Sequence, residues 1–179
     1  TVAADELNTL NDKTTGVVTV SDATTITGSY ADVNTAYTAN EDGEISGLGD
    51  EAVTISGSMT VLEANVIDAF TEGVVTASIS ANDIDALDDL TGDGNAYTVS
   101  VTDASVTAAS LNTLADKTSL VVDVSSTTVT GTVSDVEAAY ASDGLSGLGD
   151  EAITITESIT VLEANSVNDL TDGVVTATI

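Results

Sequence analysis

The residues most capable of chemistry in this sequence are carboxylates that follow glycine-rich turns. The segment Gly-Leu-Gly-Asp-Glu occurs twice, at residues 47–51 and 147–151. Hard cations such as calcium bind carboxylate and carbonyl oxygens, and both segments offer these atoms. The candidate calcium ligands are the acidic pairs of the two segments, Asp50, Glu51, Asp150 and Glu151. The alternative is that glycine and aspartate only turn the chain, with the carboxylates in solvent.

Two established calcium motifs are missing from the sequence. The Gly-Gly-x-Gly-x-Asp repeat does not occur, and Asp42-Gly43 and Asp93-Gly94 lack the ligand spacing of an EF-hand loop. We therefore expect no required cofactor, with calcium as an optional ligand.

Catalysis has few candidate groups. The sequence contains no histidine and no cysteine, so a Ser or Thr nucleophile would need Lys13 or Lys117 as its base. Both lysines occupy equivalent repeat positions near the predicted ends of helices, where the helix dipole favours a cation. Carboxylate pairs such as Asp88 with Asp89 are expected by chance among 30 acidic residues. We expect no catalytic residue and no enzyme activity.

Hydroxyl side chains alternate with apolar ones in several predicted strands. In residues 75–80, Val75 and Ala77 face one way while Thr76 and Ser78 face the other. Regular Thr ladders resemble the water-ordering faces of ice-binding proteins, although Thr also has a high intrinsic β propensity and Asp123 interrupts the pattern. Such a face could also carry O-linked sugars. The outward pairs are Thr19 with Ser21, Thr54 with Ser56, Thr76 with Ser78, Thr98 with Ser100, Thr154 with Thr156, and Thr176 with Thr178.

The charge restricts the possible partners. The chain has 30 acidic and 2 basic side chains, a formal net charge of -28, and 42% hydrophobic residues. Such a surface repels nucleic acids and anionic lipids, whereas the apolar content argues against disorder. No apolar run reaches the length of a bilayer span, so we expect no membrane insertion. Screening at high ionic strength relieves the self-repulsion, which favours a saline, extracellular location.

Internal repeats organise the chain. Residues 46–52, 60–65 and 73–77 recur 100 positions later, while Leu-Asn-Thr-Leu at residues 7–10 recurs at 111–114. We therefore expect a long repeat at 2–105 and an incomplete second copy at 106–179. The whole is expected to be a fragment of a longer protein.

Within the long repeat, helical and strand patterns alternate. Tyr30, Val33 and Tyr37 form an apolar stripe at helical spacing. Capping boxes are predicted for Thr60 with Glu63, Thr160 with Glu163, and Ser134 with Glu137. Gly73, Gly92 and Gly173 are predicted to close helices in the left-handed conformation. The helices are expected to begin near Ala3, Tyr30, Val61, Asp83, Thr107, Asp135 and Val161, and the strands to occupy residues 18–21, 53–56, 75–80, 97–102, 122–125, 153–156 and 175–179.

Alternating strands and helices predict an α/β fold with parallel strands joined by crossover connections, which are almost always right-handed. We predict a right-handed repeat solenoid of about seven coils, a single segment over residues 1–179. Its parallel strands would stack coil on coil, with short helices on the opposite side. Each coil would then bury the apolar face of its neighbour.

The repeat segments Gly-Leu-Gly-Asp-Glu-Ala, Thr-Val-Leu-Glu-Ala-Asn and Gly-Val-Val-Thr-Ala-Ser-Ile resemble tandem arrays in very large cell-surface or secreted proteins of marine bacteria, notably cyanobacteria. The resemblance covers essentially the whole chain. It implies a structural region of an adhesin, surface layer or extracellular filament. The expected partners are neighbouring repeats or copies of the chain stacked end to end. A calcium-stiffened adhesin or an ice-binding module is the alternative.

Overall fold

The computed structural model describes residues 1–179, which divide into two compact units. The first unit comprises Thr1–Ser80 and Leu90–Thr98, and the second comprises Ala81–Asp89 and Val99–Ile179.

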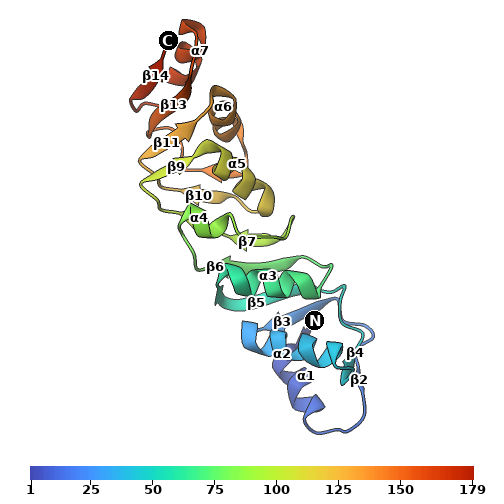
Figure 1. Cartoon of the computed structure of the whole chain (residues 1–179). Helices are drawn as coiled ribbons and strands as arrows, with labels where there is room; N and C mark the ends of the chain where they lie inside the picture. Colours follow the sequence, from blue (N-terminus) through green and yellow to red (C-terminus); the bar gives the residue numbers. More distant parts are fainter. The chain divides into compact units, whose positions relative to one another are not determined.

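The first unit contains two parallel sheets (Figure 1). One has the strand order β1-β3-β5-β6-β7, and the other pairs β2 with β4. Helices α1, α2 and α3 make the connections between β1, β3, β5 and β6. The elements are β1 (Val2–Ala3), α1 (Ala4–Asn11), β2 (Val18–Thr19), β3 (Thr25–Gly28), α2 (Tyr30–Glu41), β4 (Ile45–Ser46), β5 (Ala52–Met59), α3 (Val61–Phe70), β6 (Val75–Ile79) and β7 (Ala96–Thr98).

The second unit repeats this organisation (Figure 1). Its sheets have the orders β9-β11-β13-β14 and β8-β10-β12, and α5, α6 and α7 connect successive strands of the first of these. The elements are α4 (Ile84–Leu87), β8 (Ser100–Val101), β9 (Ser105–Thr107), α5 (Ala108–Lys117), β10 (Val122–Val124), β11 (Thr128–Gly131), α6 (Val133–Ala141), β12 (Leu145–Ser146), β13 (Ala152–Ser158), α7 (Val161–Asn168) and β14 (Val175–Thr178).

Every strand pair in both units is parallel. The predicted α/β class with parallel strands and alternating helices is therefore confirmed. The observed helices begin within two residues of the predicted starts, at Ala4, Tyr30, Val61, Ile84, Ala108, Val133 and Val161. None of them reaches the length and apolarity that a bilayer span requires.

The core of each unit is a set of stacked β-branched side chains. In the first unit Ile26 lies in register with Val53, and Val53 with Val75, and all three are fully buried. Burying a side chain of this size contributes about 1.5–3 kcal/mol. The predicted helical stripe packs here as well, with Val33 and Tyr37 buried and Tyr30 half-buried. Stability within the unit therefore comes from contacts between neighbouring strands and the helices that connect them.

Helices α2, α3, α5, α6 and α7 begin at a hydroxyl cap. The capping boxes of Thr60 with Glu63 and Thr160 with Glu163 are both present. The third predicted box is wrong, because Thr132 caps α6 and accepts a hydrogen bond from the backbone N–H of Asp135. Ser134 and Glu137 instead lie inside that helix. Helix α6 begins earlier than predicted because strand β11 ends directly before Thr132 and leaves this hydroxyl at the first turn.

The ends of the helices differ from the prediction. Gly73, Gly92 and Gly173 do not adopt a left-handed conformation. Hydroxyl turns follow α3 and α7 instead: the N–H of Gly73 donates to Thr71 Oγ1 at 3.0 Å, and the N–H of Gly173 donates to Thr171 Oγ1 at 2.9 Å. Of the two lysines, Lys117 lies in the last turn of α5, while Lys13 lies just beyond the end of α1.

Candidate functional site

The first acidic turn, residues 47–51, carries a buried glutamate. Glu51 is 3% exposed. Its Oε2 accepts hydrogen bonds from the backbone N–H of Gly49 at 2.9 Å and from the Tyr37 hydroxyl at 3.2 Å. The Tyr37 ring is stacked on Phe70, with 5.5 Å between the ring centroids. The Glu51 carboxylate, a predicted calcium ligand, thus connects the turn to helix α2, and the Tyr37 ring in turn packs on Phe70 of α3.

The second acidic turn, residues 147–151, repeats the arrangement in the other unit. Glu151 is 2% exposed, and its Oε2 accepts from the Gly149 N–H at 2.9 Å and from the Tyr140 hydroxyl at 2.7 Å. Leu170 stands where the first unit has Phe70, so Tyr140 packs without that ring. The same polar contact is built twice from the same sequence pattern.

The segment that follows α3 or α7 is hydrogen-bonded to the acidic turn of the same unit. Thr71 Oγ1 donates to the backbone oxygen of Glu51 at 2.6 Å, and the N–H of Glu72 donates to the Gly49 oxygen at 2.8 Å. In the second unit Thr171 and Asp172 make the same two bonds, at 2.7 and 2.8 Å. Gly73 passes so close that a Cβ atom there would lie 2.3 Å from the Glu51 oxygen. The turn before β5 or β13 is therefore bonded to the segment that leads into the neighbouring strand, β6 or β14.

Electrostatics keeps both tyrosines of these turns protonated. Burial raises the pKa of Tyr37, and the nearby negative charge of Glu51 raises it further. Burial also raises the pKa of Tyr140, as does its hydrogen bond to Glu151. A neutral phenol can donate its proton in a hydrogen bond to a carboxylate, so the protonated form suits the contact. The arrangement positions a turn and holds a buried carboxylate without a basic partner.

The aspartates of the two turns have different surroundings from the glutamates. Asp50 and Asp150 are exposed, whereas Glu51 and Glu151 face inward. Nowhere in the chain do three or more His, Cys, Asp or Glu side chains gather in a group that could hold a metal ion. Calcium binding at these four residues stays a prediction.

The predicted hydroxyl ladder is partly in register in the first unit. Thr54 pairs with Thr76, and Thr27 of β3 extends this column. A bulge between Thr54 and Ser58, which contains Gly57 at φ 91°, displaces Ser56. On the next strand, β7, Thr98 lies opposite Ser78 and not opposite Thr76, two residues away from the Thr54–Thr76 column.

The second unit contains a longer column. Thr107, Thr130, Thr154 and Thr176 are in register on β9, β11, β13 and β14. A bulge displaces Thr156, and Thr178 pairs with Ser158.

The remaining predicted ladder positions of the two units lie outside these columns. Thr19 pairs with Ser46, Ser100 pairs with Asp123, and Ser21 donates to Asp22 beyond the end of β2. One column of Thr per unit is therefore aligned, and the second predicted column is not.

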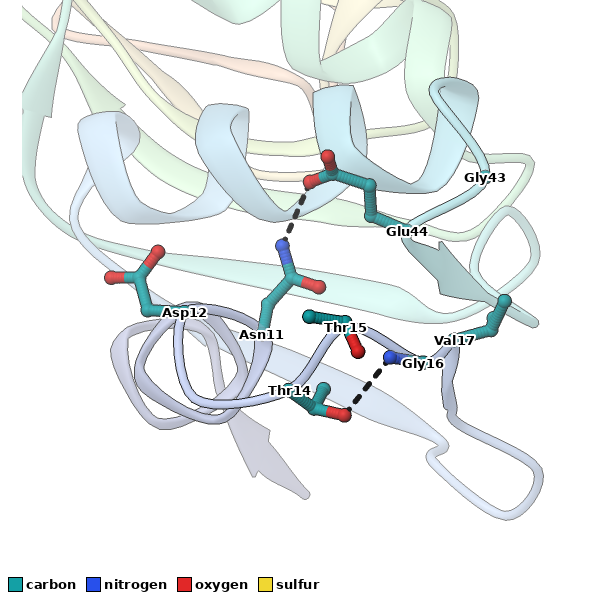
Figure 2. Close-up of a pocket in the computed structure, with 8 residues that line it drawn as sticks. All are labelled: Asn11, Asp12, Thr14, Thr15, Gly16, Val17, Gly43 and Glu44. Carbon is teal, nitrogen blue, oxygen red and sulfur yellow. Dashed lines mark hydrogen bonds between the residues drawn. The ribbon is translucent and has the colours of Figure 1, made fainter.

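A hollow of about 320 Å³ lies beside the end of α1 in the first unit (Figure 2). The Asn11 amide points toward Glu44 and donates to its Oε2 at 2.9 Å, while the Asp12 carboxylate points away from Glu44. The Gly16 N–H donates to Thr14 Oγ1 at 3.0 Å. These bonds shape a surface loop between helix α1 and strand β2.

Sequence reasoning missed Tyr37, Tyr140, Thr71 and Thr171 as members of the turn contacts. A signal was present, because Thr71 and Thr171 are separated by the same 100 positions as the acidic turns.

Comparison of the chain with known protein families, with curated proteins and with solved structures found no match.

Proposed function

We propose that this chain is a non-catalytic structural segment of a large extracellular protein, in which it acts as a rigid spacer or as a building block of a filament or surface layer. The observation that supports this most is the acidic turn itself. In each unit the coil that follows α3 or α7 is bonded to the preceding turn by the same Thr hydroxyl and the same backbone N–H. Such contacts resist sliding and bending between neighbouring coils.

We further propose that residues 1–179 form a right-handed solenoid of about seven coils. The strand orders support it, because successive strands of the main sheets follow chain order and are joined by helices. Parallel strands joined through helices are right-handed in nearly all proteins. Repeating the same connection then winds the chain in one direction.

The net charge of -28 supports a saline exterior as the working environment. With only 2 basic side chains, the chain has few groups that could neutralise the phosphates of a nucleic acid. The partners that we propose are therefore neighbouring repeats or copies of the chain.

A distance measurement tests the rigid spacer directly. The chain has no cysteine, so spin labels can be placed at Asp5→Cys and Asp172→Cys, both at exposed positions. A rigid segment gives one narrow distance distribution by pulsed electron resonance. Labels at Asp5→Cys and Glu72→Cys, both in the first unit, provide the control for label motion. A broad distribution for the first pair beside a narrow one for the control pair would refute the spacer.

Ice binding is a second candidate because of the Thr column at positions 107, 130, 154 and 176. Thr130 Oγ1 already donates to the Val106 oxygen at 3.2 Å, which leaves fewer free hydroxyls for water. Normal ice growth in the presence of the protein would remove this candidate. An unfolding midpoint that does not change with calcium or chelator at constant ionic strength would remove the calcium-stiffened adhesin.

A further inference from the structure

Four Asp-Gly dipeptides in the chain carry the groups for a spontaneous rearrangement of the backbone. They lie at residues 42–43, 93–94, 143–144 and 172–173, and all four aspartates are exposed. In such a pair the glycine nitrogen can attack the side-chain carboxyl of the aspartate, because glycine has no Cβ to hinder the approach and its backbone turns easily. The four dipeptides are identical, so their surroundings in the fold decide which of them reacts.

Three of the four glycine nitrogens are held by hydrogen bonds. The Gly43 N–H donates to the Asn40 oxygen at 3.2 Å, the Gly144 N–H to Ser142 Oγ at 3.2 Å, and the Gly173 N–H to Thr171 Oγ1 at 2.9 Å. Turning the glycine nitrogen toward the carboxyl carbon would break each of these bonds. A local opening must therefore precede the reaction at these three sites.

The fourth glycine, Gly94, lies in open space. Its N–H makes no hydrogen bond within the chain, and a Cβ atom there would meet nothing within 4 Å. Both Asp93 and Gly94 are exposed, and the φ of Gly94 is 75°, so the peptide unit between them forms the tip of a bend. The Gly94 nitrogen can therefore approach the Asp93 carboxyl without a preceding local opening.

The residues on either side of this exposed pair are anchored. Gly92 lies so close to Asp68 that a Cβ atom there would collide with Oδ1 of that carboxylate. Asn95 Nδ2 donates to the same oxygen at 2.6 Å, and Asn95 Oδ1 accepts from the Val75 N–H at 2.8 Å. Gly92 and Asn95 are both buried, and β7 begins directly after Asn95. One amide therefore joins the start of β7 to strand β6 and helix α3.

We propose that Asp93–Gly94 is a site of spontaneous isomerisation, in which the backbone is rerouted through the Asp93 side chain. The product is an isoaspartyl linkage, and the consequence is that strand β7 loses its polar attachment to β6. Isomerisation at this bond goes beyond the proposed structural function, because it gives the first unit a chemical lifetime that the fold sets at one peptide bond.

The reaction passes through a cyclic imide. The Gly94 nitrogen forms a bond to Asp93 Cγ, one C–O bond of the protonated carboxyl group breaks, and the hydroxyl leaves as water with the proton of the nitrogen. A second water molecule then opens the ring at either of its carbonyl carbons. Opening at the former main-chain carbonyl leaves the chain running through Cγ, with one additional carbon atom in the backbone. Water is released and then consumed, so the reaction needs no oxidant and no reductant.

The additional backbone atom cannot be absorbed on the side of Gly92. Gly92 is already in close contact with Asp68, so the extra length must displace Asn95. The Val75 N–H then loses its acceptor, and a buried donor without a partner is destabilising. The start of β7 is therefore the part of the first unit that isomerisation weakens.

The experiment incubates the full chain in water enriched in a heavy oxygen isotope and follows each dipeptide by peptide mass spectrometry. Each passage through the imide introduces one oxygen atom from the solvent. We expect the label to accumulate at Asp93 at least about 10-fold faster than at Asp143, because the reaction at Asp143 waits for a local opening. In concentrated urea, where both sites are unfolded, the two rates should become similar.

Two substitutions test the mechanism. Asp93→Glu keeps the charge but requires a larger ring, so labelling at this position should be lost. Asp93→Asn forms the same imide with ammonia as the leaving group, so its conversion should be faster than that of the wild type.

Amide hydrogen exchange tests the consequence, with the isoaspartyl form separated from the starting material by chromatography. Val75 should lose at least about 10-fold of its protection in the isoaspartyl form, because its N–H no longer has the Asn95 acceptor. The Val53 N–H, which donates to the Val74 oxygen at 3.0 Å, should keep its protection and serves as the internal standard.

Equal labelling of Asp93 and Asp143 in the folded chain would overturn the inference, as would a difference between them that persists in urea. Unchanged exchange at Val75 in the isoaspartyl form would show that Asn95 keeps its contact, and would overturn the consequence proposed for β7. The spin-label distances test the rigid spacer on chains that have not isomerised, so the failure of one idea is distinguishable from that of the other.

Discussion

Gly73 provides the sharpest test of strand packing in the first unit, since a single methyl group there would collide with the backbone of Glu51 and Ala52. The atoms that a Cβ would meet at Gly73 are backbone atoms: the oxygen of Glu51 at 2.3 Å, its carbonyl carbon at 2.4 Å, and the nitrogen of Ala52 at 2.6 Å. These backbone atoms, at the start of β5, cannot move aside as a flexible side chain can. We therefore expect Gly73→Ala to push β6 and the preceding turn away from β5.

The size of the effect follows from the contacts that bridge this gap. Ordinary contact begins at 3.4 Å, so the Cβ-to-oxygen distance must grow by about 1 Å from 2.3 Å. Three hydrogen bonds cross the same gap. The Thr71 hydroxyl donates to the Glu51 oxygen at 2.6 Å, the Glu72 N–H to the Gly49 oxygen at 2.8 Å, and the Val53 N–H to the Val74 oxygen at 3.0 Å. Stretching them by that amount removes most of their energy, about 0.5–1.5 kcal/mol each. We expect a loss of about 2–4 kcal/mol in the free energy of unfolding.

Gly16 offers a matched control, because Gly-Val-Val-Thr begins at both Gly16 and Gly73. A Cβ at Gly16 would meet only the flexible Thr14 Oγ1, at 3.6 Å, and its φ is not in the left-handed region. We expect Gly16→Ala to be neutral or stabilising by up to about 1 kcal/mol.

The assay is urea unfolding followed by circular dichroism, with hydrogen exchange to show which unit responds. Urea is preferred to guanidinium because it does not screen the charges of this acidic chain. Exchange protection should fall in the first unit for Gly73→Ala and stay unchanged for Gly16→Ala. If the two variants have free energies of unfolding within about 0.5 kcal/mol of each other, the close approach of Gly73 to the backbone of Glu51 does not contribute as argued.

The remaining predictions concern the acidic turns, a helix cap and the net charge. Tyr140→Phe should cost about 1.5–3 kcal/mol, because Glu151 keeps its burial but loses a 2.7 Å donor; equal urea midpoints for variant and wild type would contradict this. Burial raises the pKa of Tyr140 in the folded protein. The stability that its protonated form contributes is therefore complete below the unfolded pKa of about 10 and is lost as the pH rises toward the folded pKa. Tyr140→Phe lacks this group, so its stability should decline less steeply above about pH 10. Thr160→Ala should cost about 1 kcal/mol through loss of the capping box. The hydrogen bonds from Thr160 lower the pKa of Glu163. The stability that Glu163 contributes is therefore present above its unfolded pKa and is lost as the pH falls. A Glu163→Gln variant whose stability falls in acid as steeply as that of the wild type would refute this. Sodium chloride should raise the unfolding midpoint up to roughly 0.5 M because it screens the net charge of -28, and a midpoint independent of salt would show that self-repulsion is not significant.

The sequence alone was sufficient to predict the alternation of helices and parallel strands. Helix starts are local events, since a capping hydroxyl such as Thr60 and its partner Glu63 lie within one turn of each other. Strand faces follow from the two-residue period, which correctly placed Val75, Ala77 and Ile79 inward. Both signals depend on neighbours in the chain, so they can be read without knowing the packing.

Only the tertiary structure decided the surroundings of the acidic turns and the alignment of the hydroxyl columns. Glu51 is buried because Tyr37 and Thr71, 14 and 20 residues away along the chain, close over it. Register across strands is equally non-local: the bulge at Gly57 displaces Ser56 although the two-residue pattern of β5 begins regularly. The role of Gly73 also depends on packing, because the backbone of Glu51 and Ala52 leaves no room for a side chain there. Contacts between neighbouring strands join residues far apart in sequence, and short-range patterns contain no information about the distances between them.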